Sequence, residues 1–173
     1  MELPENALGI PTLAPVSPNV LSATLNRVQP NRFSAVIQAK PGAVFEGSVD
    51  LARLNFTAPA GAASASIQIP LANAAAKQAD TGAILRPNTQ PGRVYLINET
   101  PLLEASALAN GNIQLTVLGR AGKTYSIDAS PGVKNVVWTA TGSVTIPAGA
   151  IQAQLAPFKP TDLQRYFRAR EGN

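Results

Sequence analysis

Residues 112–118, Asn-Ile-Gln-Leu-Thr-Val-Leu, alternate polar and apolar side chains, and residues 123–129, Lys-Thr-Tyr-Ser-Ile-Asp-Ala, repeat this alternation. A period of two puts the apolar side chains of a β-strand on one face. The two runs are separated by residues 119–122, Gly-Arg-Ala-Gly, and a glycine-containing loop of this length is typical of a β-hairpin. The pair therefore predicts two antiparallel strands with one buried face, which carries Leu115, Tyr125 and Ile127.

Short runs of the same kind recur along the chain, and 13 Gly and 15 Pro supply turns between them. Short strands separated by turns are typical of antiparallel β-sandwiches. We therefore expect an all-β protein. The other predicted strands cover residues 32–39, 47–56, 64–71, 93–97, 136–139, 143–146, 151–155 and 164–169. The pattern breaks over residues 98–110, which predicts two tandem sandwich domains, 27–104 and 105–173.

Residues 1–26 are predicted to form an extended, proline-rich leader, because the prolines in its first 18 residues disfavour helix. Part of this leader has the character of an edge strand. Such a strand either completes a sheet of its own chain or completes the sheet of a neighbour, which would link chains into an oligomer or fibre. We favour self-completion. The residues expected to form this strand are Val20, Leu21, Thr24 and Leu25.

The composition disfavours an enzyme. The chain has no Cys, no His and only ten carboxylates, whereas acid–base catalysis near neutral pH usually relies on His and nucleophilic catalysis on a residue beside a base. No disulfide, thiolate metal site or cofactor is expected. The aspartates lie in separate segments without the spacing of a calcium loop, although an ion shared between loops stays open. These are Asp50, Asp80, Asp128 and Asp162.

The aromatic and basic residues have two interpretations each. Trp138, the single tryptophan, is predicted to anchor the core, and the alternative is a carbohydrate platform. The run at 165–170, Arg-Tyr-Phe-Arg-Ala-Arg, suggests nucleic-acid or glycan contact or, as we prefer, a final strand with a buried aromatic. The net charge of +4 is spread without a patch, so we expect no nucleic-acid partner. The predicted core anchors are Phe56, Ile67, Val94, Leu115, Tyr125, Ile127, Trp138 and Phe167.

Two stretches resemble known modules. Residues 33–97 resemble the closing strands of a cohesin-like sandwich, on the basis of Phe45-Glu46-Gly47, the run 51–56, Ser64-Ala65-Ser66-Ile67 and Gly92-Arg93-Val94. The second half is similar to an immunoglobulin-like β-sandwich at the C-termini of large exported proteins of Verrucomicrobia and related bacteria. Its matching pieces are Leu115 to Gly119, Gly122 to Ser130, Trp138 and Tyr166 to Ala169. The resemblance implies export and membership of a larger surface protein, and it implies no activity.

The expected function is that of a non-catalytic module of a bacterial extracellular or cell-surface protein, serving assembly or attachment. Its partners would be the remainder of a larger exported polypeptide or another surface protein. No apolar stretch is long enough to span a membrane. The acidic start lacks the features of a signal peptide, so an exported protein would have this chain as a mature fragment or a piece. The alternatives are a carbohydrate-binding module and an accessory domain of an exported hydrolase.

Overall fold

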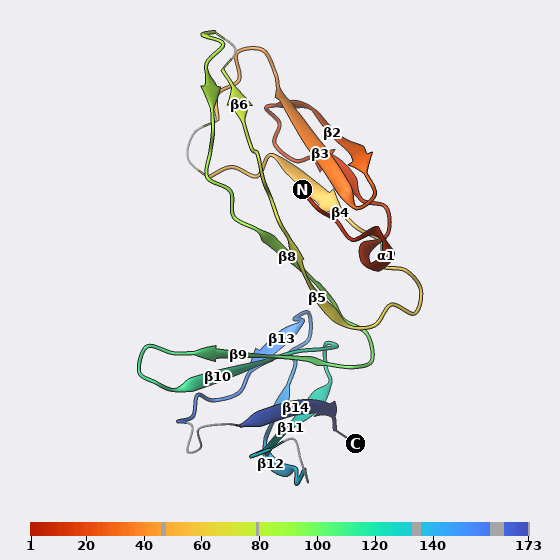
Figure 1. The fold of residues 1–173 in the computed structure, drawn as a ribbon, viewed down its shortest axis with the longest axis vertical. Helices are drawn as coiled ribbons and strands as arrows, with labels where there is room; N and C mark the ends of the chain where they lie inside the picture. Colours follow the sequence, from red (N-terminus) through yellow and green to blue (C-terminus); the bar gives the residue numbers. More distant parts are fainter. Residues whose placement is uncertain (46–47, 79, 133–135, 160–164, 173) are drawn as a thin grey trace. The chain divides into compact units, whose positions relative to one another are not determined.

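A computed structural model describes residues 1–45, 48–78, 80–132, 136–159 and 165–172 (Figure 1). Within them the all-β prediction is confirmed, because one short helix accompanies a series of strands paired into small antiparallel sheets. The elements are α1 (Glu5–Leu8), β1 (Thr12–Pro15), β2 (Val20–Gln29), β3 (Arg32–Ala39), β4 (Ala52–Asn55), β5 (Ala65–Ile69), β6 (Ala76–Lys77), β7 (Ile84–Leu85), β8 (Gly92–Leu96), β9 (Leu102–Ala107), β10 (Ile113–Leu118), β11 (Thr124–Ser130), β12 (Thr139–Thr145), β13 (Gln152–Gln154) and β14 (Tyr166–Glu171).

The chain divides into two compact units. Unit 1 comprises Met1–Ala62 and Ile67–Val94, and unit 2 comprises Ala63–Ser66 and Tyr95–Asn173. The strands β5 and β8 form a two-stranded sheet. The boundary predicted between residues 104 and 105 falls inside β9, a strand of unit 2.

Unit 1 contains three antiparallel pairs, β1 with β4, β2 with β3, and β6 with β7. The segment expected to be a leader holds α1, β1 and most of β2. The strand β2 pairs with β3 of the same chain along most of its length, with Thr24 opposite Val36.

The start of the chain is held against the β2–β3 hairpin. Met1 and Phe33 exchange backbone hydrogen bonds of 2.8 and 2.9 Å, and the Leu3 amide donates to the Asn31 carbonyl at 2.7 Å. The predicted exclusion of helix from this segment is wrong over Glu5–Leu8. Pro4 stands just before the helix, where its missing amide hydrogen costs no hydrogen bond, and Gly9 ends the helix with φ of 68°.

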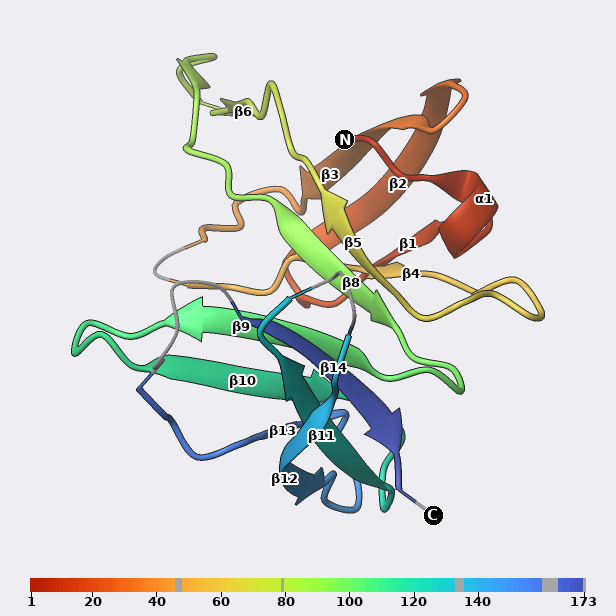
Figure 2. The same ribbon diagram turned by 60° about the horizontal axis from the view of Figure 1, so that its bottom comes forward.

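Unit 2 contains two three-stranded antiparallel sheets, β13-β10-β9 and β12-β11-β14 (Figure 2). The predicted hairpin of residues 112–129 is therefore wrong, because β10 and β11 belong to different sheets and each is the central strand of its own. Their connection at residues 119–123 crosses from one sheet to the other. The true hairpin is β9 with β10, where Leu115 lies opposite Ala105.

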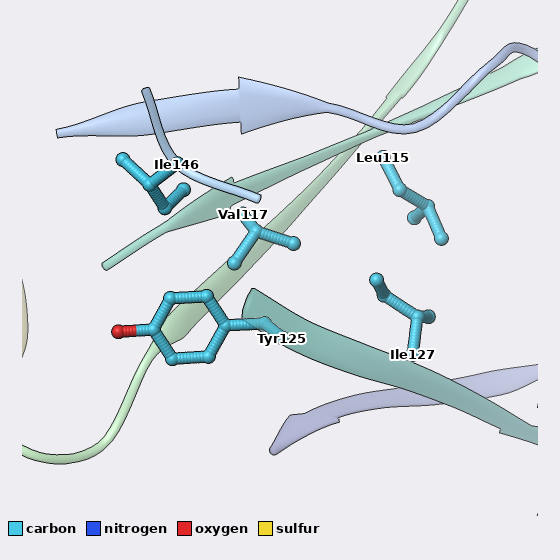
Figure 3. Close-up of a cluster of buried hydrophobic side chains, with 5 residues drawn as sticks. All are labelled: Leu115, Val117, Tyr125, Ile127 and Ile146. Carbon is cyan, nitrogen blue, oxygen red and sulfur yellow. The ribbon is translucent and has the colours of Figure 1, made fainter. Parts of the chain in front are cut away.

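The two sheets of unit 2 share one core, as expected for a small β-sandwich. Figure 3 shows Leu115 and Val117 of β10 facing Tyr125 and Ile127 of β11, with Ile146 beside the tyrosine ring. All five side chains are fully buried. Partly buried residues surround them, namely Leu103, Ile113, Val144, Ala150, Ala153, Leu155, Phe158, Phe167 and Ala169.

Candidate functional site

The predicted core anchors occupy three kinds of position. Leu115, Tyr125 and Ile127 are in the core of unit 2. Phe167 packs against that core, with its ring centroid 5.6 Å from that of Phe158. The remaining four are only partly buried, namely Phe56, Ile67, Val94 and Trp138.

A carboxylate and two arginines of unit 2 lie on the outer face of the sheet β12-β11-β14. Alternation along β11 sends Tyr125 and Ile127 inwards and therefore puts Asp128 on the opposite face. Asp128 lies opposite Arg168 in the register of β11 and β14, and Arg170 follows two residues later on the same face. The pairing of β11 with β14 thus places the carboxylate of Asp128 beside the guanidinium groups of Arg168 and Arg170.

Asp128 is almost covered although it lies on the outer face. Its side chain is 4% exposed, and its Oδ2 atom accepts hydrogen bonds of 3.0 Å from the Nε atoms of Arg168 and Arg170. The hydrogen bond from Arg170 is the largest influence on the Asp128 pKa, and with that from Arg168 it lowers this pKa despite the opposing effect of desolvation. The carboxylate is therefore ionised and paired under neutral conditions.

Trp138 completes this cluster from the edge of the sheet. The expected strand at residues 136–139 is wrong for its first three residues, since β12 begins at Thr139. The indole ring instead lies against Arg168, whose Cζ atom is 4.5 Å from the ring centroid. Arg168 is thus held by Asp128 and by a cation–π contact. We call Asp128, Trp138, Arg168 and Arg170 the outer-face cluster.

A second charged cluster joins the end of β14 to the connection between the sheets. Glu171 pairs with Arg120 at 2.5 Å and with Lys123 at 2.9 Å. The hydrogen bond from Lys123, followed by that from Arg120, lowers the pKa of Glu171. The Arg120 amide in turn donates to the buried Tyr125 hydroxyl at 2.8 Å. Residues 119–123 are therefore fastened both to the core and to β14.

The contacts of both clusters join segments of unit 2 to one another. The outer-face cluster joins β14 to β11 and to Trp138. The second cluster joins the connection at 119–123 to β14 and, through the Tyr125 hydroxyl, to β11. Among the residues that the structure describes, no three His, Cys, Asp or Glu side chains come together to hold a metal ion. Asp50 and Asp80 are exposed, and Asp162 lies outside the described residues.

The predicted edge strand is β2. Val20 is buried, Leu25 is partly buried, and Leu21 and Thr24 are exposed. Its partner β3 was predicted as a strand but not as an exposed one, and its Val36 and Ile37 side chains are exposed. The signal was present, because residues 33–39, Phe-Ser-Ala-Val-Ile-Gln-Ala, contain none of the charges or prolines that usually protect an edge.

Comparison with protein-family models, curated proteins and solved structures found no match to this chain. Within the described residues, no helix is both long and apolar enough to cross a membrane.

Proposed function

We propose that this chain is a non-catalytic structural or interaction module of a bacterial extracellular or cell-surface protein, serving assembly or attachment. Unit 2 would be an immunoglobulin-like sandwich, and unit 1 would correspond to the closing part of a cohesin-like sandwich. The observation that carries the proposal is that Asp128 and Glu171 both form ion pairs that hold separate segments of unit 2 together.

The state of Asp128 supports a structural role over an acid–base role. A general acid or base works best when its pKa lies near the operating pH and when it can reach a substrate. The pKa of Asp128 is shifted in the opposite direction, and its side chain is nearly covered by two arginines. Removing this group should therefore weaken the fold and leave no activity to lose.

The composition of the chain and its resemblance to exported modules support the proposed extracellular location. Charged residues make up only 14% of the chain, which also has no cysteine. Low charge with many turn residues suits a surface protein, and both resemblances described above are to parts of exported proteins. The partners of the module would be the rest of a larger exported polypeptide or another surface protein.

A carbohydrate-binding module is the second candidate, and Tyr166 is the observation in its favour. This side chain is 38% exposed and shares the outer face of its strand with Arg168. Sugar rings stack on open aromatic faces, but the Arg168 guanidinium lies over the Trp138 ring. Within the described residues, Trp138 thus has a guanidinium over its ring and does not form with Tyr166 an open aromatic pair, which supports the scaffold role.

Surface labelling and activity assays test the proposal together. An antibody raised against the purified chain should label intact cells of the source organism under conditions that leave a cytoplasmic marker unlabelled. Purified chain should not turn over chromogenic glycosides, esters or peptides. Turnover that disappears in Asp128→Asn, or labelling only after lysis, would contradict the proposal. Retardation of the chain in polysaccharide gels, abolished in Tyr166→Ala, would favour the glycan-binding alternative.

A further inference from the structure

The strand β3 has a free edge. In the part of the chain that the structure describes, β3 belongs to a sheet of two strands and pairs along its length only with β2 (Figure 2). Both irregularities of this ladder add a residue to β2, at Leu21 and Val28, so β3 itself is regular. A regular strand with one unpaired side can accept another strand.

The hydrogen bonds at the ends of β3 show which of its backbone groups point away from β2. The amide and carbonyl of Phe33 bind Met1, on the side opposite β2, whereas the Lys40 amide binds Asn19, which precedes β2. Backbone groups alternate along an antiparallel strand. The amides and carbonyls of Ala35, Ile37 and Ala39 therefore point away from β2, along the free edge.

The side chains around this edge are uncharged and exposed. Val36 is 52% exposed and Ile37 is 39% exposed. The nearest charged residues of the strand and its end are Arg32 and Lys40. At the Arg32 end, Met1 to Leu3 already lie alongside the edge, which shows that it forms strand pairs. The free portion therefore runs from Ser34 to Lys40.

We propose that the free edge of β3 pairs with the same edge of a second copy of this chain, antiparallel about a two-fold axis at Ile37. This inference rests on the proposed role in assembly and names its partner. The two sheets would join into one continuous four-stranded sheet. The outward backbone groups would bond as Ile37 with Ile37 of the second copy, and Ala35 with Ala39 of the second copy.

The properties of the strand select this register. A two-fold axis at Val36 would put Arg32 opposite Lys40 of the second copy and would require Phe33, whose backbone is already bound to Met1. An axis at Gln38 would oppose Ala35 to Pro41, which has no amide hydrogen. An axis at Ile37 opposes Lys40 to Ser34 and ends the ladder where Met1 begins. The free segment is therefore complementary to itself in one register.

A charge-swap experiment on the full chain tests the pairing, because Ile37 would lie opposite itself. Native mass should rise from one chain towards two across a series from about 1 µM to about 1 mM. Ile37→Glu and Ile37→Lys should each remain monomeric at every concentration, since like charges would meet at the two-fold axis. An equimolar mixture of the two variants should regain the two-chain mass. Val28→Glu and Val28→Lys are matched controls, because Val28 is 62% exposed on β2, and they should behave as the parent chain.

Hydrogen exchange on the parent chain provides a measurement that needs no variant. With increasing concentration, the amides of Ala35, Ile37 and Ala39 should become protected, whereas those of Val36 and Gln38 should change little. A single-chain mass at every concentration, a mixture that stays single, or equal loss in the Val28 variants would overturn the inference. So would a parent chain that stays single and binds an extended peptide of another protein. None of these results would alter surface labelling or the expected lack of turnover, so the proposed function is tested separately.

Discussion

Tyr125 connects the core of unit 2 to the segment that crosses between its sheets. The ring is fully buried, and its hydroxyl accepts a hydrogen bond from the Arg120 amide. Gly119 lies so close to this ring that a Cβ atom there would overlap it. The glycine and the tyrosine therefore form one packed pair, and the crossing segment is fixed from inside the sandwich.

Removing the Tyr125 hydroxyl should cost stability without opening a cavity. Tyr125→Phe leaves the Arg120 amide without its acceptor, and we expect it to lower the free energy of unfolding by about 1 kcal/mol. Tyr125→Ala should cost about 3–5 kcal/mol, because the ring fills the core. Urea denaturation measures both. Tyr166→Phe is the control, since Tyr166 is exposed, and an equal loss in that variant would contradict the role of the buried hydrogen bond.

Asp128 should make the stability of unit 2 depend on pH in the acid range. Its pKa is lower in the folded chain than in the unfolded chain, because Arg170 and Arg168 stabilise the carboxylate. The stabilisation is therefore complete above the unfolded pKa of about 4 and is lost as the pH falls through the lower folded pKa. The midpoint of thermal unfolding, followed from pH 7 downwards, should fall less steeply in Asp128→Asn than in the parent chain.

The Asp128 experiment has a second expected result and a control variant. Asp128→Asn should also unfold at a lower temperature at pH 7, because two arginines lose their counter-ion. Asp50→Asn, at an exposed position, should reproduce the parent profile. An unchanged acid slope in Asp128→Asn would show that the outer-face cluster does not contribute to folding.

At the scale of elements, the central strands should be the most stable parts of unit 2. The strands β10 and β11 have hydrogen-bonded neighbours on both sides, whereas β9, β12, β13 and β14 are edges. Amides bonded in the middle of a sheet open only with larger structural fluctuations. Hydrogen exchange followed by NMR should therefore be slowest in β10 and β11. Slower exchange in β9 or β12 would contradict the strand order.

The strands could be predicted from the sequence more readily than their partners. Alternating side chains located β5, β10 and β11 to within one or two residues, and short runs of β-forming residues located β3 and β8 equally well. Both signals depend on local geometry. The same alternation fits a hairpin and a crossing between sheets, so it did not distinguish the two connections. What distinguishes them is the packing of Gly119 against Tyr125 and the pairing of β10 and β11 with separate partners, and neither is a local property of the sequence.

In the candidate site, too, the local features could be predicted from the sequence and the long-range contacts could not. The burial of Leu115, Tyr125 and Ile127 follows from alternation, but the position of Trp138 does not. Its apolar neighbours suggested a core strand, whereas its ring packs on Arg168, which lies 30 residues later in the chain on β14. The charges opposite Asp128 were visible in the sequence only as a basic run, because the register of β11 and β14 joins distant segments.

At the scale of the whole molecule, unit 2 should fold without most of unit 1. Its core draws only on residues after position 95, and both of its three-stranded sheets lie in that range. A chain of residues 95–173 should therefore unfold cooperatively in urea and retain the near-ultraviolet signal of a packed Tyr125. Residues 63–66 are the remaining part of this unit, so a version that restores them as a linked peptide is the control. A fragment without cooperative unfolding in either form would show that the units depend on each other.

The place of β14 also bears on the order in which the protein is made. It leaves the ribosome after every other strand of unit 2, and Arg168 follows Asp128 by 40 residues. Until then the nascent sheet has no cation for Asp128, whose burial without one is costly. We therefore expect unit 2 to finish folding only after β14 has left the ribosome. A chain stalled before Tyr166 should be cleaved faster by a protease than the full chain, and equal rates of cleavage would contradict this expectation.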